Sequence, residues 1–167
     1  MLTKHYLVVF KHVFLMTVMG VLLAACDQNA EDSKVTEVEV VAPTLSDKNI
    51  QSFTLKMAED YNANLDSLMV GFHQAKKEDD AYKFVNFRNQ QWTPNYIKQK
   101  DYYQTVLARN AAYLSNSPSR PLFDKFESLI YIGINLKNAL LDDDNVKLQA
   151  QFAEIKKDKA IVNRLIK

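Results

Sequence analysis

The chain of 167 residues contains only three glycines, one cysteine and three histidines. Phosphate-binding loops, disulfide frameworks and histidine-based metal sites each need more of these residues than the chain supplies. The composition is otherwise ordinary, with 47% hydrophobic and 25% charged residues, which is typical of a chain that buries a core. The length is that of a single domain. We therefore expect one globular domain with no cofactor and no metal site.

The first 25 residues have the pattern of an export signal. Lys4 and Lys11 are their only lysine, arginine or acidic residues, and an uncharged run extends from Val13 to Ala25. As a helix, this run rises about 20 Å, whereas the hydrocarbon core of a bilayer is roughly 30 Å thick. The segment is therefore predicted to be a secretory signal peptide rather than a permanent transmembrane helix.

The residues Leu23-Ala24-Ala25-Cys26 end the uncharged run. They resemble the lipobox of bacterial prolipoproteins, in which an aliphatic residue and two small residues precede a cysteine. The resemblance implies that Cys26 is acylated and becomes the mature N-terminus. A buried thiol is the alternative interpretation, but the position of the only cysteine at the end of the run favours the lipobox.

Two residues after the cysteine bear on the location of the protein. In lipoproteins of enteric type, an aspartate directly after the acylated cysteine resembles a signal for retention at the inner membrane, and a neighbouring amide strengthens it. Asp27 and Gln28 fit that pattern. The resemblance implies the periplasmic face of the inner membrane, with the outer membrane as the alternative because other bacterial lineages sort by different rules.

Residues 26–45 are predicted to form a flexible tether. Five acidic residues and one lysine occur in 27–45, and the segment has no glycine. At about 3.3 Å per residue, these residues reach about 60 Å when extended. Residues 35–41 alternate β-branched and other side chains, as an edge strand does, but no partner strand is evident.

Residues 46–167 are predicted to be an all-α domain. Apolar residues recur at steps of three and four over 50–75, and Ser46 is a candidate cap for that helix. We expect a short helix over 82–87, a third helix opened by Thr93-Pro94 and continuing to 114, a fourth over 121–141 and a fifth after the aspartates 142–144. Short loops favour an up-down antiparallel bundle of four main helices plus one short helix. The fourth is the most apolar and should be central.

Few residues of the predicted domain suggest catalysis. His73 is the only histidine after the signal peptide, and it lies beside the apolar stripe of its helix, so we interpret it as a flank residue. The run Asp142-Asp143-Asp144 lacks the spacers, glycine and terminal glutamate of calcium loops, and helix capping explains it better. We therefore expect no catalytic residue and no metal-binding residue in this domain.

Aromatic and basic residues interleave between Tyr82 and Tyr103. Phe84, Phe87 and Trp92 are expected in the core. We predict a possible partner-binding surface on the third helix, made of Tyr96, Lys98, Lys100, Tyr102 and Tyr103. Neighbouring tyrosines cannot both face inward on a helix, so some aromatic surface should be exposed. Export excludes nucleic acid as the partner and leaves an envelope glycan or protein.

Gly71 and Gly133 are the only glycines after the signal peptide, and both fall within predicted helices. Glycine costs about 1 kcal/mol relative to alanine in a helix interior. We expect each of the two to allow a close crossing of helices that offsets this cost.

These observations predict a membrane-anchored, non-enzymatic envelope lipoprotein that binds another envelope component. One alternative is an inhibitor or immunity lipoprotein that blocks a toxin or hydrolase. Another is an enzyme or small-ligand carrier that acts on cell-wall material, which the small catalytic inventory disfavours.

Overall fold

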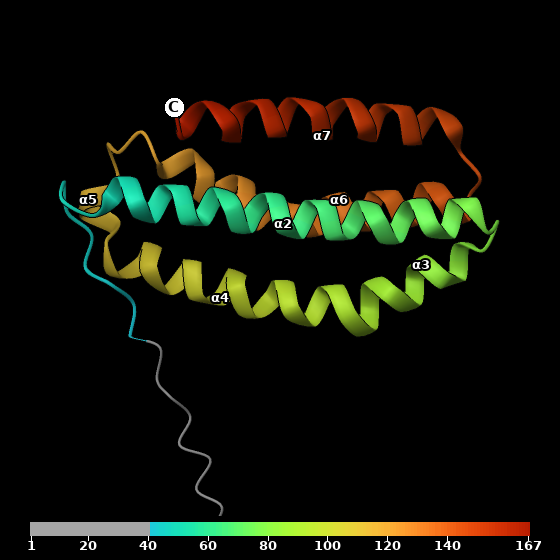
Figure 1. Ribbon diagram of the computed structural model, residues 1–167, viewed down its shortest axis with the longest axis horizontal. Helices are drawn as coiled ribbons and strands as arrows, with labels where there is room; N and C mark the ends of the chain where they lie inside the picture. Colours follow the sequence, from blue (N-terminus) through green and yellow to red (C-terminus); the bar gives the residue numbers. More distant parts are fainter. Residues whose placement is uncertain (1–40) are drawn as a thin grey trace, which may run out of the picture. The chain divides into compact units, whose positions relative to one another are not determined.

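The computed structural model describes residues 41–167, and this part of the chain is all-α (Figure 1). The predicted signal peptide, Cys26, Asp27 and Gln28 lie outside the described residues. The segment 35–41 with its alternating pattern also lies outside them, except for Val41.

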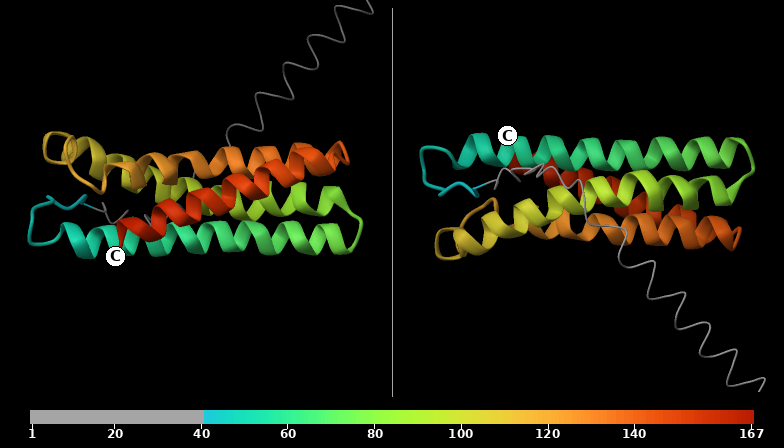
Figure 2. Two further views of the ribbon diagram at one scale, coloured as in Figure 1. Left: turned by 90° about the horizontal axis from the view of Figure 1, so that it is seen from above. Right: turned by 90° about the horizontal axis from the view of Figure 1, so that it is seen from below.

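Within residues 41–167, seven helical elements follow one another: α2 (Ile50–Lys77), α3 (Ala81–Phe87), the π-helix η1 (Arg88–Trp92), α4 (Thr93–Arg109), α5 (Ala111–Leu114), α6 (Arg120–Leu141) and α7 (Asn145–Leu165). The long elements lie lengthwise beside one another, and each runs opposite to the one before it (Figures 1 and 2). This arrangement confirms the predicted antiparallel bundle. None of the described helices combines the length and apolar character that crossing a bilayer requires.

The elements α3, η1 and α4 form one continuous helical segment, which differs from the predicted short helix and separate third helix. The N–H of Thr93 donates to the carbonyl of Arg88, five residues earlier, so the helix widens into a π-turn instead of ending. Pro94 explains the widening, because a proline has no N–H for the regular i to i−4 bond and its ring crowds the preceding turn.

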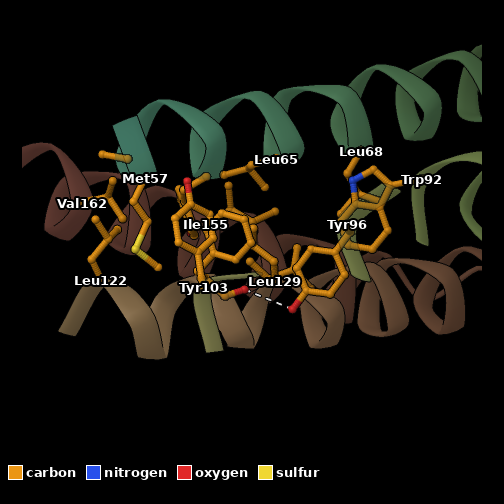
Figure 3. Packing of buried hydrophobic residues seen from close by; sticks show 14 of the residues in the cluster. Met57, Leu65, Leu68, Trp92, Tyr96, Tyr103, Leu122, Leu129, Ile155 and Val162 are labelled. Carbon is orange, nitrogen blue, oxygen red and sulfur yellow. Dashed lines mark hydrogen bonds between the residues drawn. The ribbon is translucent and has the colours of Figure 1, made fainter. Parts of the chain in front are cut away.

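The core lies along the whole bundle, and α6 is at its centre. Helix α6 contacts α2, α3, α4 and α7, as its apolar sequence predicted. The largest fully buried side chains come from α2, α3, α4, α5 and α6, and Leu148, Ile155 and Val162 add the contribution of α7. Figure 3 shows part of this cluster. The largest are Met57, Tyr61, Leu65, Leu68, Phe72, Phe84, Tyr96, Leu114, Leu122, Phe126, Leu129 and Leu136. Burial of such side chains at about 25 cal/mol per Å² is the main force that holds the helices together.

The packed domain begins earlier than the predicted boundary at residue 46. Ala42 and Leu45 are buried in the core cluster although they precede the first helix. The side chain of Asn110, between α4 and α5, accepts the Leu45 N–H at 2.7 Å and donates to the Pro43 carbonyl at 2.9 Å. These bonds replace the hydrogen bonds to water that the extended segment loses when it is buried.

Two similar turns close α2 and α6. In each turn a non-glycine residue adopts a positive φ, 53° at Asp79 and 48° at Asp143. The next residue sends its N–H back to the last turn of the helix, from Asp80 to Ala75 at 3.0 Å and from Asp144 to Ala139 at 2.9 Å. This is the Schellman pattern, in which glycine usually occupies the left-handed position.

The aspartates after these turns cap the helices that follow. Asp80 accepts the Lys83 N–H at 3.1 Å, and Asp144 accepts the Lys147 N–H at 2.9 Å. The bond from the Lys147 N–H lowers the pKa of Asp144, so this cap is lost only as the pH falls below the ordinary range of an aspartate. The prediction that the acidic run 142–144 serves as a helix cap is confirmed for Asp144, whereas Asp142 and Asp143 form the turn that closes α6.

Replacing Asp79 and Asp143 with glycine should stabilise the domain. The left-handed conformation costs an L-residue about 1 kcal/mol, and glycine adopts it without that cost, although it gives back part of the gain through the entropy of the unfolded chain. We expect each substitution to raise the free energy of unfolding by about 0.5 kcal/mol in urea titrations. Glycine at Asp142, which has an ordinary helical φ, is the control and should destabilise.

Candidate functional site

The predicted binding surface on α4 is contradicted for two of its tyrosines. Tyr96 is 1% exposed and Tyr103 is 4% exposed. The Tyr96 hydroxyl donates to the Glu127 carbonyl at 2.8 Å, and the Tyr103 hydroxyl donates to the Asp60 carboxylate at 2.6 Å. Their rings belong to the core, where Tyr96 stacks on Trp92 at a centroid distance of 5.0 Å (Figure 3). Neither ring is available to a partner.

The other members of that predicted surface stay at the surface but form no aromatic patch. Tyr102 is partly buried and packs edge-on against Tyr103, with ring centroids 5.2 Å apart. Lys98 is exposed, and Lys100 lies 3.3 Å from Asp101. The structure therefore brings two lysines and part of one ring to this face.

The expectation for the two glycines is confirmed, and both contact the same segment. A Cβ at Gly71 would overlap the ring of Phe87, which covers this glycine of α2. A Cβ at Gly133 on α6 would lie 3.1 Å from Arg88 Nε and 3.3 Å from the ring of Trp92. The α3–η1 segment thus packs closely against α2 and α6, because neither helix carries a side chain at its point of contact.

Arg88 is the residue of η1 that has a buried polar atom without a partner. The side chain is 9% exposed, and its Nε has no hydrogen-bond partner. One terminal nitrogen donates to Asn89 at 2.8 Å, and no carboxylate among residues 41–167 lies within ion-pair distance. Burial lowers the pKa of the guanidinium, which nevertheless remains charged. Unpaired buried polar groups and π-turns occur often at functional sites, which draws attention to this segment.

A groove runs along the seam between α2 and the α3–η1–α4 segment. Two adjoining cavities form it, of about 490 and about 250 Å³, and they share Ser67, Phe87 and Gln91 in their walls. Seven carboxamide side chains line the two cavities: Asn64, Gln74, Asn86, Gln90, Gln91, Asn95 and Gln99. Lys83 is the only charged side chain among the lining residues. We call this surface the amide groove.

Four of these amides are exposed and make no side-chain hydrogen bond within residues 41–167; they are Asn86, Gln90, Gln91 and Asn95. The other three are engaged. Asn64 donates to Gln99 at 2.6 Å, and Gln74 donates to Glu78 at 3.2 Å. Lys83 also bonds to Glu78, and this bond lowers the pKa of that carboxyl group. The groove therefore presents uncharged donors and acceptors that are free to bind.

The π-helix η1 supplies two neighbouring amides of the groove. Gln90 and Gln91 both line it, with Asn86 about one turn before them and Asn95 about one turn after.

A second cleft, of about 490 Å³, lies at the end of the bundle where α2 begins. Four of its polar side chains bond in pairs: Tyr113 donates to Asp47 at 2.8 Å, and the hydroxyls of Thr54 and Ser119 lie 2.7 Å apart. Gln51, Asn116 and Lys167 also line this cleft. The amide groove has four free amides and is the better candidate site.

His73, the other residue considered in the sequence analysis, is not part of a cluster of reactive side chains in residues 41–167. His73 is exposed at the edge of α2 and packs beside Phe72 and Phe152, with no acidic partner within 4 Å among the described residues. Residues 41–167 contain no group of three or more metal-ligating side chains.

Comparison with protein-family models, with curated proteins and with solved structures gives no match to this chain, so the geometry of the bundle and its amide groove has to support the functional interpretation by itself.

Proposed function

We propose that the protein is a lipid-anchored lipoprotein of the bacterial cell envelope and that its helical bundle is a non-enzymatic binding module. The sequence Leu23-Ala24-Ala25-Cys26 supports the lipid anchor, and Asp27-Gln28 supports the periplasmic face of the inner membrane over the outer membrane. The partner is another component of the envelope and not a nucleic acid.

The observation that carries the binding role is the row of free amides in the groove. A carboxamide donates and accepts hydrogen bonds, yet it neither gains nor loses a proton near neutral pH. Side chains of this kind hold and orient a ligand, whereas acid–base or nucleophilic chemistry needs groups that titrate or attack. Binding without reaction is therefore the function that this surface supports best.

The anchor and the bundle are separated by a short stretch of chain. The packed domain begins at Ala42, so about 15 residues, 27–41, follow the proposed anchor at Cys26. At about 3.3 Å per residue, they reach at most about 50 Å, less than the full segment 27–45 would. The binding module would then work close to the membrane surface.

Replacing Cys26 with serine tests the anchor. We expect the variant to stay as the uncleaved precursor or to leave the membrane fraction, because serine has no thiol to carry the lipid. Mass spectrometry of the intact protein should show the loss of the diacylglycerol and acyl groups. The control is Ser33→Ala, which should keep the mature lipidated mass. The proposal would be refuted if the Cys26→Ser protein differed in mature mass from the wild type only by the exchange of one sulfur atom for one oxygen atom.

A further inference from the structure

We propose that the amide groove binds an uncharged, hydroxyl-rich glycan chain. This inference rests on the proposed binding function and names the class of ligand for the same site. It follows from the charge of the groove, from the hydrogen-bonding chemistry of its free side chains and from the position of Phe87.

The groove is neutral where a ligand would lie. No carboxylate belongs to the lining residues, so nothing there compensates a cationic ligand. The one cation, Lys83, already bonds to Glu78 and stands at one end of the larger cavity. A charged ligand would lose its hydration without gaining an opposite charge, and that loss is costly. An uncharged ligand does not carry this penalty.

The free amides match a ligand that offers donors and acceptors in alternation. Each carboxamide presents a carbonyl oxygen and an NH₂ group side by side. A pair of neighbouring hydroxyls on a sugar ring can donate to the first and accept from the second. Asn86, Gln90, Gln91 and Asn95 repeat this arrangement along the groove, so consecutive sugar units would meet consecutive amides.

An extended or helical peptide fits the groove less well. Peptides dock by adding a strand to a sheet edge or by placing apolar anchors of a helix into an apolar groove. The described residues 41–167 contain no strand, and amides occupy the positions where apolar anchor pockets would be needed. Val70 is the only exposed large apolar side chain among the lining residues.

Phe87 provides the apolar part of the site. Its ring lines both cavities and is fixed against Gly71, where a Cβ would overlap it. Sugar rings have an apolar C–H face as well as polar edges, so a ring laid over Phe87 would keep its hydroxyls within reach of Gln91. The larger cavity, of about 490 Å³, lies within the range of about 300–1,000 Å³ typical of ligand sites.

The test is a titration of the full lipidated chain, held in a detergent without a sugar headgroup, with the neutral β-1,4-linked tetramer of N-acetylglucosamine. Binding is followed by calorimetry and by the side-chain NH₂ resonances of ¹⁵N-labelled protein. We expect affinity in the millimolar range or tighter, with shifts of the resonances of Asn86, Gln90, Gln91 and Asn95 and none at Gln149, an exposed amide of α7. The de-acetylated, cationic tetramer should bind at least about tenfold more weakly.

A double variant, Gln91→Met with Asn95→Leu, removes two free amides with little change in size. It should weaken binding of the neutral tetramer by at least about tenfold, because each lost hydrogen bond contributes to the affinity. The variant Gln149→Met is the matched control and should bind as the wild type does. Circular dichroism melting curves show that both are folded.

Three results would overturn the proposal. One is the absence of groove shifts with the neutral tetramer. Another is full binding by the double variant. A third is a set of groove shifts caused by an uncharged peptide and not by the sugar, which would indicate a protein ligand. Each leaves the fractionation of the Cys26→Ser protein unaffected, so failure here is distinguishable from failure of the proposed anchor.

Discussion

Replacing Asn110 with alanine is expected to lower the free energy of unfolding by about 3 kcal/mol. The side chain is buried and makes three hydrogen bonds, to the Leu45 N–H at 2.7 Å, the Pro43 carbonyl at 2.9 Å and the Val106 carbonyl at 2.8 Å. Alanine leaves the buried Leu45 N–H and the part-buried Pro43 carbonyl without this bond, and a buried group left unpaired costs about 1–3 kcal/mol. Urea titration at neutral pH measures the change.

The same substitution should also free the start of the domain. Without Asn110, little holds Leu45 except its apolar contacts, so the Leu45 amide should exchange its hydrogen much faster while amides in the middle of α6 change less. Asn116→Ala, at an exposed asparagine of the loop before α6, is the control and should change stability by less than about 0.5 kcal/mol. Equal effects of the two substitutions would show that the Asn110 bonds do not hold the segment.

The sequence predicted the bundle because apolar periodicity is a property of each helix alone. The apolar seam of α6, from Leu122 to Leu136, repeats at steps of three and four residues and is buried along its length. The docking of Ala42 and Leu45 is different, because it depends on an asparagine 65 residues away. No local pattern shows that contact, and so the predicted tether was several residues too long.

The error at the tyrosines has a different cause. Tyr96, Tyr103 and Val106 are spaced by seven and three residues, which is the spacing of one helical face, and all three are buried. The prediction rested on the neighbouring tyrosines 102 and 103, which cannot both face inward on a helix, and it did not say which of them does. The hydroxyls of the two buried tyrosines find acceptors inside the bundle, Asp60 for Tyr103 and the carbonyls of α6 for Tyr96. Burial raises the pKa of both tyrosines, so they stay protonated and continue to donate.

The amide groove was not predicted, because exposed amides on a helix usually indicate a solvated face, and no local pattern shows which of them gather beside a second helix. The groove lies where α2 meets the α3–η1–α4 segment, and the ring of Phe87 packs against Gly71 there. One of the two glycines, Gly71, and part of the aromatic segment 82–103 therefore belong to the site, whereas Gly133 does not line it.

Asp158→Ala is expected to lower the free energy of unfolding by about 2–3 kcal/mol. The carboxylate on α7 is 4% exposed and pairs with Lys125 on α6, which is 25% exposed. Removing one partner of such a pair leaves the other charge poorly solvated. The value lies below the range for fully buried pairs because the Lys125 amine keeps some contact with water.

The double variant Lys125→Met with Asp158→Leu should unfold within about 1 kcal/mol of the wild type. Both charges and their desolvation disappear together, and apolar side chains of similar size extend the seam that α7 already forms with Leu148, Ile155 and Val162. A cycle of the two single variants and the double variant isolates the coupling between the side chains.

A second ion pair on the same helix serves as the matched control. Lys159 on α7 bonds to Asp66 on α2 at 2.9 Å, with side chains 39% and 63% exposed. Water screens this pair, so the cycle with Lys159→Met and Asp66→Leu should give a coupling of no more than about 0.5 kcal/mol. Burial, rather than the presence of an ion pair, would then account for the dependence of α7 on Asp158. Equal couplings for the two pairs would mean that the interior position of Asp158 adds nothing to the attachment of α7.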